Sequence, residues 1–442
     1  MSSKSALEPP MWDDARRTYR LLRSISPQFH GTLLELYWTH YNAGVPLVDR
    51  GSFEQSVTDT GGLYHCQFLH ISMLAMGYHF ADQSNQDVRQ ITTISNESTF
   101  HYEAKFQVWQ RLRSPKLSTA AALIILSDLE FQVGNSALGR RFTEMASQIA
   151  LDKSTTLHDH PAGSSSEETS MRQHVFAACS LYDNNWALLG SRPPLTRALE
   201  VRHSEWAARS DDGYTSRLPS TLAGLGGQMY VAAAKLQTFY ESIVEMRHFV
   251  DTSCDGLPPL GRAYSEMATL KRGMTAWYQT LPPDLHWTSD KKDVVPLGFF
   301  LLHQQYNAAM IRLHQSFTCY PSQKTGSVAD APSENAHLKH LIAISQSVCS
   351  RHAKQIVHLL DAQQARFGHA VALLPGLQTA ATAAGALMDG ITQTKEMAQR
   401  EPSIRPLKVL LQILSASAAT CKPAGTMADM ILTFLDRSTN SS

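Results

Sequence analysis

The sequence lacks an excess of charge of either sign. Its 442 residues include 39 lysines and arginines and 39 aspartates and glutamates, so the formal net charge is zero. Charged residues make up 18% of the chain, below the roughly 25% typical of globular domains. A dedicated nucleic-acid-binding domain usually has a basic surplus, because phosphate contacts supply most of its non-specific affinity. The balance therefore argues against direct DNA contact by this chain.

Closely spaced cysteines are also missing. The six cysteines are scattered, and no two of them form a Cys-x2-Cys pair. This distribution excludes a zinc ribbon and a disulfide framework, and it indicates an intracellular protein whose cysteines are mostly small core residues. The first residues contain no apolar segment of the kind found in a signal peptide.

No segment has the apolar density of a membrane span. The longest weakly charged stretch covers residues 371–388, but it is rich in alanine, glycine and threonine and contains Pro375. A transmembrane helix would have a higher content of leucine and isoleucine. We expect a buried helix whose small residues permit close packing, and no membrane association.

The common motifs of enzymes are absent. The sequence contains no dinucleotide fingerprint, no phosphate-binding loop and no Gly-x-Ser-x-Gly nucleophile motif. Gly224, Gly226 and Gly227 cluster without the order of such a loop, and they predict a turn or the start of a helix. The sequence predicts no cofactor and names no catalytic residue. A non-enzymatic protein is favoured, although a triad built from distant residues stays open.

Histidine is frequent, but its arrangement does not predict a metal site. His158 and His160 lie in a polar loop, and His337 and His340 form an i, i+3 pair. A zinc site needs about four converging ligands. We therefore expect solvated side chains at these positions and no bound metal.

Apolar residues recur with helical spacing along nearly the whole chain. Examples are the stripe at Leu33, Leu34, Tyr37 and Trp38 and the residues Phe106, Trp109 and Leu112, which are spaced by three. No segment shows the alternation of a strand. The pattern predicts an all-α fold with later helices over residues 222–250, 262–280, 296–317, 337–365, 377–392, 404–417 and 426–436.

Three polar segments interrupt the helical pattern. They cover residues 153–170, 207–219 and 320–335, and none resembles a long interdomain linker. We expect one large, irregular multi-helix body over residues 30–436. Residues 1–29 are expected to form a tail and a first helix, and residues 437–442 a disordered tip.

A stripe of apolar side chains with polar tips lies within residues 303–317. His303 and Tyr306 fall on one helical face with Met310, Leu313 and Phe317. Such a face can line a ligand pocket, although a core helix with satisfied polar ends is the favoured interpretation. Arg192 follows a long apolar helix and could form a clamp with Asp183, although both residues could equally be simple surface charges. If a ligand site exists, Arg192, His303 and Tyr306 are its expected polar anchors.

These segments, taken in order, resemble the fungal-specific transcription factor domain, which follows the zinc-binuclear-cluster DNA-binding module in many fungal regulators. The resemblance extends over residues 30–435. Ala177 and Asn184 depart from it, because the family usually has tryptophan and arginine there. The matching elements are Val45-Pro46-Leu47-Val48-Asp49-Arg50-Gly51-Ser52-Phe53, Leu74-Ala75-Met76-Gly77, Leu117-Ser118-Thr119-Ala120-Ala121-Ala122-Leu123, Met145 to Asp152, Arg172, Val175-Phe176-Ala177, Leu181-Tyr182-Asp183-Asn184, Gly190-Ser191-Arg192-Pro193-Pro194, Trp277, Leu281-Pro282, Trp287, His303-Gln304-Gln305-Tyr306 and Leu313 to Phe317.

The six-cysteine zinc cluster of that family does not occur in this sequence. The resemblance therefore implies a nuclear transcription regulator or co-regulator that acts without its own zinc-cluster domain. Its expected partners are proteins, such as a zinc-cluster transcription factor, and a small-molecule effector. A role in a secondary-metabolite gene cluster is expected by analogy.

Two alternatives remain open. The same helical scaffold could serve as a cytoplasmic ligand-binding or catalytic protein of small-molecule biosynthesis, because a fold does not fix a function. The coding sequence could also start upstream, with an exon that encodes the cysteine cluster.

Overall fold

The structure is a computed structural model of the whole chain. It describes residues 11–58, 66–91, 93–94, 97–155, 166–190, 225–252, 260–318, 332–368, 373–394 and 397–440. Arg192 and the predicted loop over residues 207–219 lie outside these ranges.

The described residues form helices almost throughout, which confirms the all-α prediction. In the first half, the run of helices is interrupted by a minimal hairpin, in which β1 pairs antiparallel with β2. The elements are α1 (Met11–Ser24), α2 (Pro27–Leu36), the π-helix η1 (Tyr37–Asn42), α3 (Arg50–Thr58), α4 (Gln67–Phe80), α5 (Gln86–Arg89), β1 (Thr93–Ile94), β2 (Glu97–Ser98), α6 (Thr99–Arg111), α7 (Leu117–Gln132), α8 (Ser136–Thr155) and α9 (Ser166–Gly190).

The second half contains long helices and two short 3-10 turns. All seven helices expected after residue 220 are present, and most of their ends lie within a few residues of the predicted ones, although the helix expected from residue 404 already begins at Met397. The elements are α11 (Leu225–Thr252), α12 (Leu260–Gln279), η4 (Pro283–Leu285), η5 (Lys291–Asp293), α13 (Leu297–Thr318), α14 (Pro332–Phe367), α15 (Leu374–Gln393), α16 (Met397–Ser417) and α17 (Lys422–Asn440).

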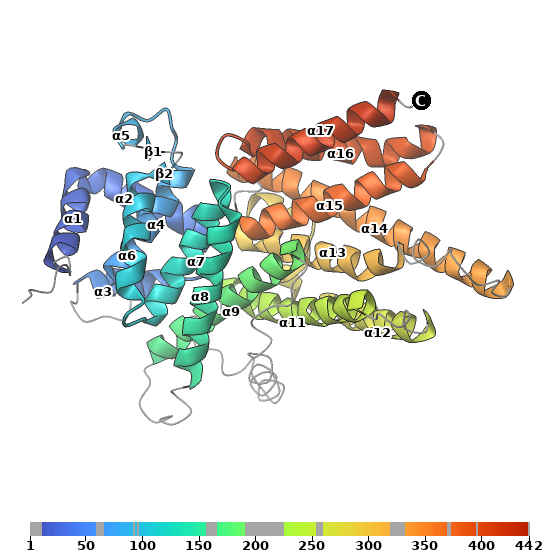
Figure 1. Cartoon of the computed structure of the whole chain (residues 1–442), viewed down its shortest axis with the longest axis horizontal. Coiled ribbons are helices and arrows are strands. Elements are labelled where there is room, and N and C mark those ends of the chain that lie inside the picture. Colours follow the sequence, from blue (N-terminus) through green and yellow to red (C-terminus); the bar gives the residue numbers. More distant parts are fainter. Residues whose placement is uncertain are drawn as a thin grey trace, which may run out of the picture.

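The helices form an elongated body with α1 at one end and the tips of α12 and α14 at the other (Figure 1). Helix α7 lies in its interior, and every one of its residues is buried. An apolar core surrounds α7 and continues into α15, α16 and α17. A second core lies between α11, α12, α13 and α14, where aromatic side chains are frequent.

Several predicted boundaries were wrong. Helices α8 and α9 extend into the predicted loop 153–170, and α14 begins at Pro332, inside the predicted loop 320–335. Helix α17 continues to Asn440, so the expected disordered tip is largely helical. Serine and threonine in a terminal turn do not end a helix whose apolar face is anchored by packing. The buried helix expected over residues 371–388 is present as α15. None of the described helices is long and apolar enough to span a membrane.

Candidate ligand-binding site

A groove with a volume of about 460 Å³ lies where segments from both halves of the chain meet. Its walls come from the turn after η1, the start of α3, and helices α9, α11 and α13. Most lining groups are small or apolar, and a few are polar. The lining residues are Asn42, Ala43, Gly44, Val45, Pro46, Val48, Asp49, Arg50, His174, Ala177, Ala178, Leu181, Gly226, Gly227, Met229, Ala233, Ala234, Gln237, Pro296 and Gly298.

The side chain of Asn42 fixes the conformation of residues 43–48, which form one wall of the groove. Its side-chain oxygen accepts hydrogen bonds from the backbone N–H groups of Leu47 and Val48, both at 3.0 Å. Its side-chain nitrogen donates to the Val48 carbonyl at 2.9 Å. An asparagine that bonds nearby backbone groups in this way fixes a turn that has no regular secondary structure of its own. The segment therefore presents a defined surface to the groove.

Close backbone contact joins this turn to α13. The backbone N–H of Gly298 donates to the Ala43 carbonyl at 2.9 Å. A Cβ atom at Gly298 would lie only 2.9 Å from that oxygen, so the contact requires glycine. The start of α13 is thereby fixed against the turn after η1, and the two ends of the groove are linked across more than half of the chain.

Small side chains on α9 and α11 leave the groove open. Ala177 and Ala178 face it from α9, and Ala233 and Ala234 from α11. Ala177 stands where the family resemblance places a tryptophan. A tryptophan side chain here would occupy much of the volume that alanine leaves free. The open space in this chain thus depends on one of its departures from the family pattern.

The polar side of the groove contains His174 and Asp49. Burial lowers the pKa of His174, and the negative charge of Asp49 opposes that shift. One oxygen of Asp49 accepts the backbone N–H of Ser52 at 2.9 Å, as expected for a residue that caps the start of α3. Arg50 is bound by Glu35 and Glu54 on the surface. The site is therefore apolar with a neutral imidazole and a carboxylate, which suits a largely apolar ligand with a hydrogen-bonding group.

His303 and Tyr306, two of the three predicted anchors, lie together in the second core. The Tyr306 ring stacks on the Tyr278 ring with centroids 4.0 Å apart, and the Tyr278 hydroxyl pairs with His303 Nδ1 at 2.9 Å. Burial lowers the pKa of His303 to about 4. Neither side chain lines the groove described above. The contacts are those of a packed core, which is the interpretation that the sequence favoured.

The third predicted anchor, Arg192, lies outside the described residues. Its proposed partner Asp183 is buried on α9. A ligand site formed by Arg192, His303 and Tyr306 therefore stays a prediction.

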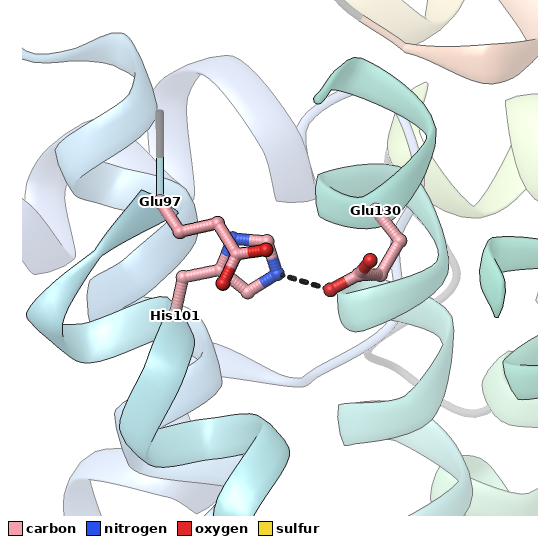
Figure 2. Close-up of side chains that lie close together, drawn as sticks. All are labelled: Glu97, His101 and Glu130. Atoms are coloured by element: carbon pink, nitrogen blue, oxygen red, sulfur yellow. Dashed lines mark hydrogen bonds and ion pairs between the residues drawn. The ribbon is translucent and has the colours of Figure 1, made fainter. Parts of the chain in front are cut away.

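A compact charged cluster lies between β2, α6 and α7. Ligand atoms of Glu97, His101 and Glu130 all lie within 4.8 Å of one another, a spacing that could hold a metal ion. Figure 2 shows the imidazole of His101 next to the Glu97 carboxylate and bonded to Glu130. The sequence did not single out this cluster, because Glu130 is far along the chain from Glu97 and His101, and a pair of potential ligands alone does not predict a metal site.

A lysine already provides the positive charge in this cluster. Lys105 Nζ lies 2.6 Å from Glu97 Oε1 and 2.9 Å from Glu130 Oε1. The other oxygen of Glu130 accepts from Asn135 at 2.7 Å. Although burial opposes it, hydrogen bonds from His101 and Lys105 lower the pKa of Glu130. The cluster is therefore an ion-pair network that fixes α6 on α7, and its chemistry does not require a metal.

Three of the described cysteines, Cys179, Cys349 and Cys421, are buried and do not have the properties of nucleophiles. Burial raises the pKa of Cys179 to about 12 and that of Cys421 to about 11, and a thiolate is the reactive form. Cys349 is also buried. In the part of the chain that the structure describes, these thiols act as small core side chains, as the sequence predicts.

Comparison with known proteins identifies the domain to which the groove belongs. Residues 34–252 match the model of the fungal-specific transcription factor domain. This chain carries a fungal-specific transcription factor domain. The match confirms the resemblance inferred from the sequence motifs for residues 34–252, and these residues include every groove-lining residue except Pro296 and Gly298.

Two curated proteins that are similar to this chain are transcriptional regulators. The nitrogen assimilation transcription factor nit-4 of Neurospora crassa is 23% identical over 386 residues, which cover 80% of this chain and 33% of the relative. An uncharacterized transcriptional regulatory protein of Schizosaccharomyces pombe is 21% identical over 347 residues, which cover 74% of this chain and 52% of the relative. The chain thus matches about a third and about half of the lengths of these relatives.

Several segments that line the groove were noted in the sequence, but the sequence did not predict that they lie next to one another. The hydrophobic-Pro-hydrophobic segment, the cluster at Gly226 and Gly227, and the substitution at Ala177 were each noted separately. Their convergence depends on how α9, α11 and α13 pack, which is a tertiary feature. The usable signal was the replacement of a large family residue by alanine, since it predicts open space.

Proposed function

We propose that this chain is a fungal transcription regulator that acts in the nucleus through protein contacts and responds to a small molecule bound in the groove. The observation that carries this proposal is the match of residues 34–252 to the fungal-specific transcription factor domain. The two relatives, both of them transcriptional regulators, support it.

The chain is proposed to act on transcription by binding protein partners, among them a zinc-cluster transcription factor. The zero net charge supports this assignment, because a surface without basic excess has little attraction for the phosphate backbone. Genes of a secondary-metabolite cluster are the proposed targets, by analogy with regulators of this family.

A reporter assay tests regulation without requiring the natural target genes. The chain is fused to an unrelated DNA-binding domain, and expression of a reporter downstream of the matching operator is measured in a fungal host. We expect a change in reporter expression of at least several-fold relative to the DNA-binding domain alone. Unchanged expression, together with exclusion of a tagged chain from the nucleus, would contradict the proposal.

The groove is the proposed effector site. Its volume lies in the range of small-molecule sites, and its lining combines apolar walls with His174, Asp49 and Gln237. The proposed ligand is a largely apolar molecule with at least one hydrogen-bonding group, such as a polyketide-like or aromatic metabolite.

Ligand binding can be tested with one substitution that fills the groove and one that does not. Ala177→Trp puts a large ring into the groove, whereas Ala416→Trp puts the same ring on an exposed position of α16. A panel of apolar metabolites is screened by thermal shift on the wild-type chain. We expect that compounds which stabilise the wild type also stabilise Ala416→Trp but not Ala177→Trp. Equal responses of both variants would remove the groove assignment.

The same screen addresses the catalytic alternative. Each stabilising compound is incubated with the chain and analysed by mass spectrometry. Recovery of unchanged compound is expected for an effector, whereas conversion that is lost in Ala177→Trp would favour an enzyme of small-molecule biosynthesis built on this scaffold.

A further inference from the structure

Helix α6 presents an aromatic face to solvent. Its three exposed residues are Tyr102, Phe106 and Trp109, and each of them is aromatic. Their exposed fractions are 49%, 41% and 72%. The spacing i, i+4, i+7 places the three rings on one side of the helix. A helix at the surface of a globular protein normally has charged or polar residues there, so this exposed aromatic face is unusual.

The opposite side of α6 fixes this orientation. The buried carboxylate of Glu103 accepts a hydrogen bond from Thr18 at 2.6 Å and forms an ion pair with Arg17 at 2.7 Å. Gln107 donates to the same Thr18 hydroxyl at 2.7 Å. A rotation of α6 that buried the three rings would break these bonds and leave buried polar groups without partners. The rings are therefore held outward by the packing of α1 on α6.

Positive charge borders the aromatic face. The Arg17 guanidinium lies 4.9 Å from the Phe106 ring centroid and 5.5 Å from that of Tyr102. Arg20, one turn further along α1, is exposed, and so is Arg113 just beyond the end of α6. Among the described side chains of α1 and α6, the only acidic one is that of Glu103, which is buried. The face thus combines apolar rings with a cationic border.

We propose that this aromatic face of α6 docks an amphipathic helix of a protein partner, with acidic residues beside its apolar stripe. Tryptophan and tyrosine are enriched among the residues that dominate binding energy at interfaces, and an apolar patch with a charged border is typical of such sites. A helix with apolar residues at i, i+3, i+4 and i+7 matches the spacing of the three rings. Its carboxylates would face Arg20 and Arg113.

The charge distribution favours this occupant over two others. A second copy of the chain would place its own arginines opposite Arg17 and Arg20, and like charges at an interface are unfavourable. Single-stranded nucleic acid can stack on aromatic rings, but its affinity depends on many phosphate contacts along a basic groove. Here Arg17 is already paired with Glu103, and the chain has no net positive charge. This surface is distinct from the effector groove and is testable whether or not the chain regulates transcription.

A binding experiment with the full-length chain tests the proposal. The probes are fluorescein-labelled amphipathic peptides of about four helical turns, in which leucine, phenylalanine or methionine forms the apolar stripe and glutamate occupies the flanks. Matched peptides have lysine in place of glutamate. Fluorescence anisotropy at about 0.15 M salt gives the dissociation constants. We expect at least one acidic peptide to bind and its lysine counterpart to bind at least about tenfold more weakly.

Substitutions on the exposed face give the decisive comparison. Trp109→Ala and Phe106→Ala are each expected to weaken binding of the acidic peptide by about tenfold or more, as for central interface residues. Arg20→Glu is expected to weaken it as well. Met430→Ala, which removes an apolar side chain from α17 with an exposure between those of Phe106 and Trp109, is the matched control and should leave the affinity unchanged. Far-UV circular dichroism should show the wild-type helix content for all four variants.

Several results would overturn the proposal. These are failure of all acidic peptides to bind the wild type, equal binding of the lysine peptides, and an affinity that Trp109→Ala does not alter. Self-association in sedimentation velocity that Trp109→Ala removes would assign the face to a second copy. Binding of a single-stranded oligonucleotide that depends on Trp109 would assign it to nucleic acid.

Discussion

The side chain of Asp128 on α7 accepts a hydrogen bond from the backbone N–H of Leu374, a residue 246 positions later in the chain, at 2.9 Å. Leu374 begins α15, so a buried carboxylate of the fungal transcription factor domain satisfies the N-terminus of a helix beyond the matched region. Tyr182 donates a second hydrogen bond to Asp128, and Tyr41 pairs with Tyr182 at 3.2 Å. This network joins η1, α7, α9 and α15.

Removal of the Asp128 carboxylate should destabilise the whole chain. In Asp128→Ala the buried Leu374 N–H and Tyr182 hydroxyl lose their acceptor, and each unsatisfied group costs about 1–3 kcal/mol. We expect the free energy of unfolding to fall by about 3 kcal/mol, measured by urea denaturation. Asp128→Asn keeps one acceptor oxygen and should cost less. Asp429→Ala, at an exposed position of α17, should change stability by less than about 0.5 kcal/mol. Equal midpoints for Asp128→Ala and Asp429→Ala would refute the role of this network.

Acid should destabilise the chain through three buried histidines. Burial lowers the pKa of His303 and His352 to about 4 and that of His314 to about 3. The unfolded chain binds protons at these side chains near pH 6.5, so between about pH 6.5 and 4 the unfolded state holds more protons than the folded state. Stability is therefore fully present above about pH 6.5 and is lost as the pH falls, by up to about 1.4 kcal/mol per pH unit for each histidine.

Asp128 acts in the opposite direction over the same pH range. Burial raises its pKa to about 7, so the folded state retains a proton that the unfolded state releases near pH 4. Its contribution to stability falls as the pH rises from about 4 to 7. Because three histidines oppose this single aspartate, we expect a net loss of stability as the pH falls. Urea midpoints from pH 4 to 8 check this, and Asp128→Asn should make the acid loss steeper. A midpoint that rises as the pH falls below 6 would contradict the account.

Gly77 should tolerate no side chain. A Cβ atom at this position would lie 2.0 Å from the backbone oxygen of Leu33, because α4 crosses α2 at close range there. Gly77→Ala must displace a helix backbone, and we expect a loss of at least about 3 kcal/mol. Gly385→Ala, in the middle of α15 with nothing within 4 Å, should instead stabilise the chain by about 0.5–1 kcal/mol. Differential scanning calorimetry would show opposite shifts in Tm, and a parallel shift of the two variants would contradict the proposed helix contact.

Substitution at Tyr306 separates a core role from a ligand-binding role. Tyr306→Phe keeps the stacked contact with Tyr278 and loses the hydroxyl interaction with Thr275, so we expect a loss of about 1 kcal/mol in unfolding free energy. Tyr306→Ala should cost about 3–5 kcal/mol. Binding of compounds that depend on Ala177 should be the same in Tyr306→Phe as in the wild type. A compound whose affinity falls in Tyr306→Phe, but not in Ala177→Trp, would place the ligand in the His303 cluster instead.

Helix identity could be read from the sequence because apolar residues recur with a period of 3.6. The helix over residues 222–250 and the Ala/Gly/Thr-rich helix α15 were both predicted. The ends of the helices were harder to predict than their positions, since α14 and α17 continue through residues whose polar sequence is typical of loops or fraying ends. The outward direction of the aromatic face of α6 could not be predicted, because periodicity gives the side of a helix on which residues gather but not the direction in which that side points. That direction depends on Thr18 and Glu103, which meet only in the folded chain.

The candidate site shows the same limit. Arg192, His303 and Tyr306 were chosen as polar groups next to apolar stripes. In the structure, His303 pairs with the Tyr278 hydroxyl and Tyr306 stacks on the Tyr278 ring within a packed core. The groove was not predicted, because its defining feature is the small volume of Ala177 opposite the turn held by Asn42. The space that a small side chain leaves open can be recognised only when the positions of the surrounding residues are known.

Transcript profiling tests the central claim most directly. The natural gene is fused to a degradation tag, and RNA is sequenced shortly after depletion, with a second copy that encodes either the wild type or Ala177→Trp. We predict that depletion changes the expression of a defined set of genes several-fold, and that the wild-type copy restores it whereas Ala177→Trp does not. An unchanged transcript profile after complete depletion, under conditions in which the protein is expressed, would contradict a role in transcription regulation.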